Sequence, residues 1–211
     1  GSSDSLTILG AGAASGVYTP SASTFGNGII SIDGSTITFT GLEPVDISGL
    51  TNFTIVTPNA VDVIEIDSPG FGQNRVKGTS GGVSFEELIF SNITNFIIDT
   101  ATNDTSSTSN DSITFSANLV ASNLATMTVN AGLGNDIIDA TALEFSIGVA
   151  LNGGAGNDTL IGGGGNDTLN GGDGTDTVRQ TIDDDQKLTN TTLEGIGTDA
   201  LSSIERAELT G

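Results

Sequence analysis

Residues 153–179 read GGAGNDTLIGGGGNDTLNGGDGTDTVR and form the most regular stretch of the chain. It contains three tandem copies of one nine-residue unit: a glycine-rich turn, Asn or Thr, an aspartate, one further residue and an aliphatic residue. A looser copy, AGLGNDIID, occupies 131–139, and weaker echoes occur at 110–113 and 61–64. One unit cannot bury its aliphatic side chain alone, so a short fixed period predicts a solenoid of stacked coils. A flexible glycine linker would not keep an aspartate and an aliphatic residue in register.

The rest of the chain also has the pattern of strands. Among 211 residues there are 30 glycines, with abundant Thr, Ser, Asn and Asp, which argues against helices. Short alternating segments bounded by turn residues predict strands at 29–32, 36–39, 61–66, 111–115 and 127–129. The exceptions that we expect are a turn or bulge at 85–90 and a helical segment at 201–207. The sequence therefore predicts an all-β fold.

Composition excludes several classes of site and partner. Lys and Arg total 5 and Asp and Glu total 26, which gives a net charge of −21, so phosphates of nucleic acids and anionic membrane surfaces repel the chain. Cys and His are both absent, which excludes disulfides, thiolate and imidazole metal ligands and a Ser-His-Asp triad. A bound metal would take oxygen ligands, calcium first. No apolar run approaches the roughly 20 residues of a membrane helix, so we expect no membrane insertion. Because of the net charge of −21, we also expect no nucleic-acid binding.

The repeat unit supplies the ligands that calcium prefers. Glycines at the first, second and fourth positions allow the positive φ of a tight turn. In stacked parallel coils, successive carbonyl groups of such a turn alternate between the coil above and the coil below. With the aspartate at the sixth position, two stacked turns can provide the six to eight oxygens of a calcium site. The aliphatic residues that follow each turn then point inward from short strands; they are Ile138, Leu160, Leu169 and Val178.

These units resemble the GGxGxDxUx nonapeptide of the RTX (haemolysin-type) calcium-binding repeat family. The three copies in 153–179 fit every defined position, and the copy at 131–139 fits except for Ala131 in place of a glycine. The resemblance covers about a quarter of the chain. It implies a β-roll in which two nonapeptides form one coil of about eighteen residues, so that alternate turns stack. Residues 1–130 carry no such motif, although they look similar to coils that precede these repeats in large secreted bacterial proteins.

The resemblance also implies where calcium binds. The turns of Asp136, Asp158 and Asp176 share one side of the roll, and we expect one ion in each gap between them. The turn of Asp167 lies on the opposite side, and a third ion would lie between it and the acidic turn 183–185. The predicted set for two to three calcium ions combines turn carboxylates with turn carbonyl groups. Its members are Asp136, Asp158, Asp167, Asp176, Asp183 and Asp185, with Gly132, Gly134, Gly153, Ala155, Gly162, Gly164, Gly172 and Gly174.

We therefore expect a right-handed parallel β-helix, or β-solenoid, that ends in a calcium-binding β-roll with a C-terminal cap. The expected regions are β-helix coils of about twenty to twenty-five residues over 1–130, the RTX-like roll over 131–179, and the cap over 180–211. In the cap, Ile204, Ala207 and Leu209 would cover the open end, because a bare final coil exposes strand edges and core.

The predicted function is that of a structural or adhesive calcium-binding module. It would be part of a secreted or cell-surface bacterial protein, with surface polysaccharide or other surface proteins as partners. Folding would be coupled to calcium outside the cell, because without ions the net charge of −21 is self-repelling. No catalytic constellation is evident, so no enzyme activity is expected.

Two alternatives remain open. A β-helix acting on polysaccharide as a lyase or hydrolase could use the carboxylate pair Glu65 and Asp67, or the basic pair Arg75 and Lys77. The favoured interpretation is that these residues form a solvated strand face and neutralise their neighbours. A flat Thr-rich face could bind ice or carbohydrate, although Thr is also a good strand former. Its members would be Thr36, Thr38, Thr40, Thr126 and Thr128.

Overall fold

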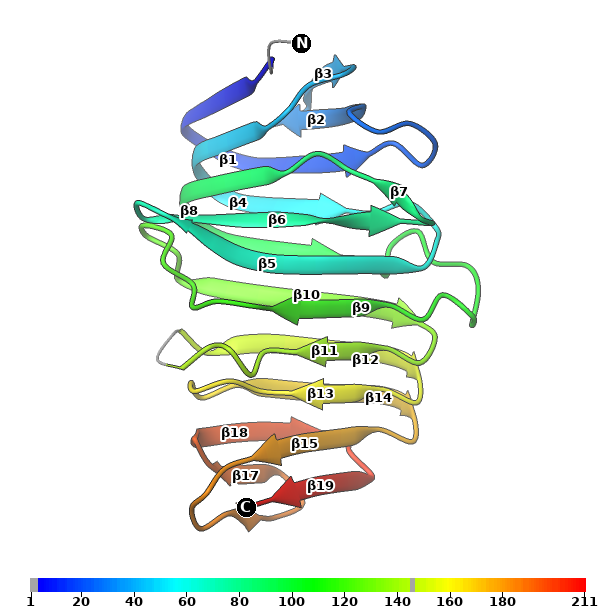
Figure 1. The fold of residues 1–211 in the computed structure, drawn as a ribbon, viewed down its shortest axis with the longest axis vertical. Helices are drawn as coiled ribbons and strands as arrows, with labels where there is room; N and C mark the ends of the chain where they lie inside the picture. Colours follow the sequence, from blue (N-terminus) through cyan, green and yellow to red (C-terminus); the bar gives the residue numbers. More distant parts are fainter. Residues whose placement is uncertain (1–3, 145–146) are drawn as a thin grey trace.

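The computed structural model of the chain describes residues 4–144 and 147–211. Within these residues the chain forms nineteen strands and no helix, which confirms the predicted all-β fold. The strands stack as the rungs of an elongated solenoid, with the N-terminus at one end and the C-terminus at the other (Figure 1). None of the described segments is a helix long and apolar enough to cross a membrane.

Two columns of parallel strands form the walls of the solenoid. The first column consists of β1 (Leu6–Pro20), β4 (Val45–Val56), β8 (Leu88–Asp99), β10 (Thr126–Leu133), β12 (Val149–Gly156), β14 (Thr168–Gly174) and β18 (Gly197–Ser202). The second consists of β5 (Asp62–Gly70), β9 (Ser112–Phe115), β11 (Ile137–Asp139), β13 (Thr159–Ile161), β15 (Thr177–Thr181) and β19 (Arg206–Thr210). From β4 onward the chain alternates between the columns, as in a parallel β-solenoid.

Antiparallel hairpins interrupt the coils at three places. They are β2 (Gly28–Ile32) and β3 (Ser35–Phe39) on β1, β6 (Gln73–Ser80) and β7 (Val83–Ser84) between β5 and β8, and β16 (Lys187–Leu188) and β17 (Thr192–Gly195) on β18. Val45 pairs with Leu88 of the next coil. The upstream coils are thus far longer than the expected twenty to twenty-five residues. That expectation was wrong because inserted hairpins, and loops in the coil between β8 and β10, lengthen a coil without changing its parallel register.

The core changes in character along the solenoid. Upstream coils bury aromatic rings: Phe90 stacks on Phe96 with ring centroids 4.0 Å apart, and Phe53 lies 5.9 Å from Phe96. In the roll the inward side chains are aliphatic and fully buried, as predicted: Ile138, Leu160, Leu169 and Val178. Aliphatic side chains bury less apolar area than aromatic rings. The roll therefore depends more than the upstream coils on interactions other than its core.

Two segments, 85–90 and 201–207, were expected not to form strands. Of the turn or bulge expected at 85–90, only residues 85–87 lie outside the strands; the expectation was wrong for 88–90, which begin β8. The helical segment expected at 201–207 is wrong, because β18 and β19 pair there with the preceding coil. Of the expected cap residues, Ile204 and Leu209 pack against the core, whereas Ala207 is exposed. A neighbouring strand already in register outweighs local helical periodicity.

The core placement predicts that Phe96→Ala lowers the free energy of unfolding by about 3–5 kcal/mol, because it leaves a cavity among buried rings. The matched control is Phe71→Ala, which removes a ring that is 101% exposed. It should change the free energy by less than about 0.5 kcal/mol. Urea unfolding in saturating calcium measures both variants. Equal losses in the two variants would contradict this core.

Candidate metal centre

One side of the solenoid carries a column of stacked carboxylates. The backbone N–H of Asp136 donates to Asp158 Oδ1, and the N–H of Asp158 donates to Asp176 Oδ1, each over 2.8 Å. Each carboxylate therefore lies between its own coil and the preceding coil. The weaker sequence echoes at 61–64 and 110–113 belong to the same column. We call the full column the aspartate ladder; its members are Asp62, Asp111, Asp136, Asp158, Asp176 and Glu205.

The turns beside the ladder stack in the predicted order. Gly132 aligns with Gly154, and Gly154 aligns with Gly172. The φ angles of Gly154 and Gly156 are +116° and +144°, values that side chains rarely adopt. A Cβ on Gly156 would overlap the carbonyl oxygen of Gly134 in the coil above. The carbonyl groups at the second and fourth turn positions therefore point toward the following coil.

The first and third turn positions differ from the second and fourth in backbone angle or in the direction of the carbonyl group. The third carbonyl points back toward the preceding coil, since the Gly134 N–H donates to the Ala155 oxygen (2.9 Å). Gly153, at the first position, does not have the positive φ that we expected. A Cβ there would instead overlap Asp158 Oδ2. Gly153 thus leaves room for the carboxylate of its own turn, whereas the turn of Asp136 has Ala131 at this position.

Asparagine at the fifth position forms a second column next to the ladder. The Asn157 N–H donates to Asn135 Oδ1 (2.7 Å), and the Thr175 N–H donates to Asn157 Oδ1 (2.9 Å). These bonds satisfy the amides of the tight turns, which would otherwise compete for the aspartate oxygens.

The ladder leaves buried oxygens without partners. One carboxylate oxygen has no hydrogen-bond partner in five members that are at most 2% exposed: Oδ1 of Asp62 and Oδ2 of Asp111, Asp136, Asp158 and Asp176. Burial raises the pKa of Asp158 to about 6 and that of Asp136 to about 7, and the neighbouring carboxylates add to both shifts. An unpaired buried charge is costly. A divalent cation beside these oxygens would remove that cost, so the ladder fits the calcium that the repeats imply.

The backbone would supply most of the ligands. Among the described residues no three acidic side chains converge at one point. In the gap between the Asp136 and Asp158 turns, the Gly132 and Gly134 carbonyl groups point down and the Ala155 carbonyl group points up. Asp158 adds its carboxylate. Carbonyl and carboxylate oxygens are the ligands that calcium prefers.

The next gap repeats this arrangement. Gly172 and Gly174 lie directly beneath the carbonyl oxygens of Gly154 and Gly156. The Asp176 carboxylate lies in the gap, where it accepts the N–H of the Asp158 turn. The structure thus brings together the predicted residues of the two sites on this side of the roll.

The turn on the opposite side is built differently. Asp167 Oδ1 accepts the Val149 N–H (2.9 Å), and Oδ2 accepts the Gly163 N–H (2.8 Å). Gly162 packs against the same carboxylate, and Gly164 packs against carbonyl groups of the turn above. Both oxygens of Asp167 therefore have partners, in contrast to the ladder.

The coil beneath Asp167 differs from our expectation. The Asp167 N–H donates to Asp199 Oδ1 (3.0 Å). Asp183 and Asp185 lie in an exposed turn, so their expected position beneath Asp167 was wrong. The β16–β17 hairpin carries the chain past that turn and brings Asp199 into register. The sequence did contain the signal, because GIGTDAL at 195–201 has the spacing of the repeat.

The residues considered for catalysis neutralise one another. Arg75 donates to both carboxylate oxygens of Asp67, over 2.9 and 2.6 Å. The Lys77 amine lies 3.0 Å from Asp67 and 3.3 Å from Glu65. Hydrogen bonds from Arg75 are the main reason that the pKa of Asp67 lies below its ordinary value. This arrangement agrees with the favoured interpretation.

The threonines do not form one flat face. Thr36 and Thr38 lie on β3, in the hairpin at the N-terminal end. Thr126 and Thr128 lie on β10, between β8 and β12 (Figure 1). An extended Thr-rich surface for ice or carbohydrate is therefore not assembled from them.

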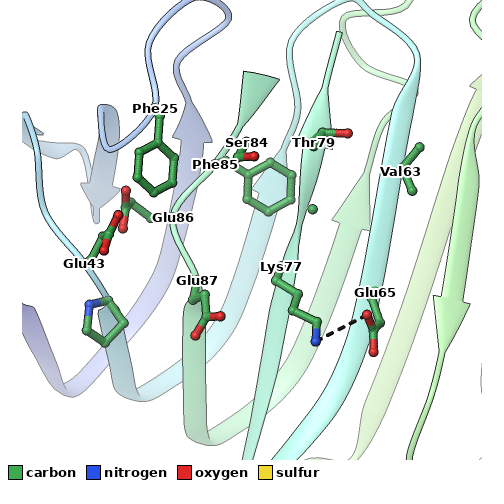
Figure 2. A pocket seen from close by; sticks show the side chains of 12 residues that line it. Phe25, Glu43, Val63, Glu65, Lys77, Thr79, Ser84, Phe85, Glu86 and Glu87 are labelled. Carbon is green, nitrogen blue, oxygen red and sulfur yellow. Dashed lines mark ion pairs between the residues drawn. The ribbon is translucent and has the colours of Figure 1, made fainter. Parts of the chain in front are cut away.

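A pocket of about 680 Å³ lies beside the ion pairs. Figure 2 shows the Glu43 and Glu86 carboxyl groups near Phe25, and the Lys77–Glu65 ion pair at the other end. Glu86 is 0% exposed, and neither of its oxygens has a hydrogen-bond partner. Burial raises its pKa to about 7, and the charge of Glu43 adds to the rise. The pocket thus contains a carboxyl group that titrates near neutral pH.

The repeat segment matches a known family. Residues 150–178 match the family model described as RTX calcium-binding nonapeptide repeat (4 copies). A search of curated proteins found no match to the chain. The family match confirms the resemblance inferred from the repeat unit. The all-β, mainly parallel solenoid agrees with the β-roll that such repeats form.

The substitution Gly156→Ala tests whether the turns stack closely. The new Cβ would overlap the Gly134 carbonyl oxygen and force the turns apart, so calcium affinity should fall by at least tenfold, about 1.4 kcal/mol. The matched control is Gly12→Ala, because Gly12 also has a positive φ (+91°) but nothing within 4 Å of the added atom. Calorimetric titration with calcium measures both. An unchanged affinity in Gly156→Ala would show that the turns do not stack this closely.

The buried carboxyl group predicts a pH-dependent effect of Glu86→Gln. The folded state holds the Glu86 proton more tightly than the unfolded chain does, so this group destabilises the fold increasingly as pH rises from 4.5 to about 7. Glu86→Gln should therefore gain stability over the wild type at about pH 8 and not at about pH 4. Thermal unfolding at both pH values, with the exposed Glu144→Gln as control, measures the difference. A gain that does not depend on pH would contradict the assignment.

Proposed function

We propose that this chain is a calcium-dependent structural module whose coils are held together by ions between the stacked turns of its roll. The observation that carries the proposal is the aspartate ladder, in which buried oxygens without partners lie in register with turns of the calcium-binding repeat. These oxygens face the backbone carbonyl groups that calcium also requires.

Electrostatics explains why calcium would control folding. The chain has a net charge of −21, and the ladder adds buried carboxylates one coil apart. Without a cation these charges oppose the stacking of the coils. With a cation between turns, the binding free energy becomes folding free energy. The aliphatic core of the roll offers little to replace it.

Calcium concentration would then decide where the chain folds. Extracellular modules bind calcium with dissociation constants of roughly 10⁻⁴–10⁻³ M, far above cytoplasmic concentrations. Such a chain stays unfolded inside the cell and folds outside. Repeats of this family are typical of secreted bacterial proteins, which supports placement of this chain in a secreted or cell-surface protein.

The proposed role of the folded rod is structural or adhesive, as a spacer or binding scaffold with surface polysaccharide or other surface proteins as partners. Its elongated shape suits a spacer (Figure 1). The lyase or hydrolase alternative is disfavoured, because Arg75 and Lys77 are bound to carboxylates and are not free to act on a substrate.

Two ions are proposed on the ladder side, between the turns of Asp136 and Asp158 and between those of Asp158 and Asp176. A third is proposed on the opposite side, between the turns of Asp167 and Asp199. The Asp199 carboxylate lies in that gap, where it accepts the Asp167 N–H. Gly197 lies directly beneath the Gly165 carbonyl oxygen, which repeats the geometry of the ladder-side turns.

Removal of calcium should unfold the roll. Calorimetric titration of chelated protein, followed in parallel by circular dichroism, should show cooperative binding of two or more ions with a gain of strand signal. Asp158→Asn should reduce the number of ions by at least one and require about tenfold more calcium to fold. Asp46→Asn, on the outer face of β4, is the matched control. The same strand content in chelator and in millimolar calcium would contradict the proposal.

A further inference from the structure

The coil above the first repeat turn (131–136) contains a copy of that turn, which an insertion interrupts. Asp111 stacks on Asp136 through a ladder bond of 2.7 Å. Asn110 stacks on Asn135, whose N–H donates to the Asn110 side chain (2.7 Å). Between the matching positions, the upper coil carries an inserted loop at 102–108 where the lower turn has a single third-position residue. The insertion hides the repeat in the sequence, but the stacking is preserved.

The inserted loop brings Asp104 over the repeat turn. Asp104 Oδ2 lies 3.0 Å from the place that a Cβ on Gly132 would occupy, and the Ser109 carbonyl oxygen lies directly against Gly134. In the following coils, carbonyl oxygens of the second and fourth turn residues take these two places. The Asp104 carboxylate thus replaces the second-position carbonyl group, and Ser109 supplies the fourth.

Three carboxylate oxygens in this gap lack hydrogen-bond partners. Asp136 is 1% exposed; its Oδ1 accepts the Asp111 N–H, and its Oδ2 has no partner. Both oxygens of Asp104 are also buried without a hydrogen bond. The Leu133 amide and Ser109 face the Asp104 carboxylate without reaching hydrogen-bond geometry. Burial raises the pKa of both aspartates, and repulsion by Asp104 adds to the rise at Asp136.

Nothing positive compensates these carboxylates. None of the ion pairs among the described residues involves Asp104 or Asp136. The lower turn contributes a further oxygen: the Thr100 hydroxyl donates to the Ala131 carbonyl (2.6 Å), which shows that this carbonyl faces the upper coil. Carboxylate and carbonyl oxygens therefore converge from both coils on one gap.

We propose that the gap between the 102–108 loop and the Asp136 turn is a further calcium site, with Asp104 and Asp136 as its carboxylate ligands and Ser109 as a carbonyl ligand. The proposal rests on the proposed function for its turn geometry, but it lies outside the segment that matches the repeat family. The site joins the upstream coils, which carry no repeat, to the first turn of the roll.

This site has two carboxylates where each ladder-side gap of the tandem repeats has one. Additional ligand charge tightens calcium sites. The ion in this gap is therefore bound more tightly than those between the tandem turns. It fixes the end of the roll to a coil that has its own aromatic core.

The test is calorimetric titration of the wild type, Asp104→Asn, Asp158→Asn and the control Asp46→Asn with calcium chloride. The proposal expects Asp104→Asn to bind one ion fewer than the wild type, with the tightest binding phase lost. Asp158→Asn should instead lose a weaker phase and keep the tightest one. Asp46→Asn should match the wild type.

The outcomes separate this proposal from the proposed function. If Asp104→Asn binds as many ions as the wild type while Asp158→Asn loses one, the additional site is overturned and the proposed function stands. If the wild type binds no calcium, the proposed function itself fails.

Hydrogen exchange of the wild type decides the matter even if Asp104→Asn does not fold. Calcium should slow exchange of the amides in 102–109 as strongly as it slows those in the 153–158 turn. Protection of the 153–158 turn with no change in 102–109 would overturn the additional site.

Discussion

Buried carboxylates stacked one coil apart set the main electrostatic constraint on the roll. Parallel strands hold neighbouring ladder residues about 4.8 Å apart. At that distance, and at an effective dielectric constant near 20, two unit charges repel by about 3–4 kcal/mol. Backbone N–H groups satisfy one oxygen of Asp111, Asp136, Asp158 and Asp176 and leave the other without a partner. A cation between the turns removes both the repulsion and the unpaired oxygen without any change of backbone register.

This constraint divides the chain into two parts with different sources of stability. The upstream coils bury stacked rings such as Phe90 and Phe96 and add hairpins that cover strand edges. In the roll, tight turns bring backbone against backbone, which is why a Cβ on Gly156 has no room. The roll has a column of carbonyl groups that point toward neighbouring coils, and it buries less apolar area. Under the proposed function, calcium and turn glycines belong together, because the ion would need carbonyl groups that only closely stacked turns present.

The sequence predicted the parts of the fold that follow from periodicity. The nonapeptide placed Asp136, Asp158 and Asp176 on one side of the roll, and the structure has them there. The predictions of the upstream coil length and of the residue beneath Asp167 were wrong for the same reason. Inserted hairpins and loops shift the residue number at which a strand returns to register, and no period reveals their length. Asp104 could not be found from sequence, because the fold of an inserted loop alone places it over the repeat turn.

The most direct test of calcium between stacked turns is the anomalous scattering of calcium in crystals grown with the ion. Calcium peaks are expected in the gaps between the turns of Asp136, Asp158 and Asp176. Each peak should lie about 2.3–2.6 Å from carbonyl and carboxylate oxygens of both coils. Calcium found only at exposed acidic residues such as 183–185, with none beside the ladder, would contradict the account.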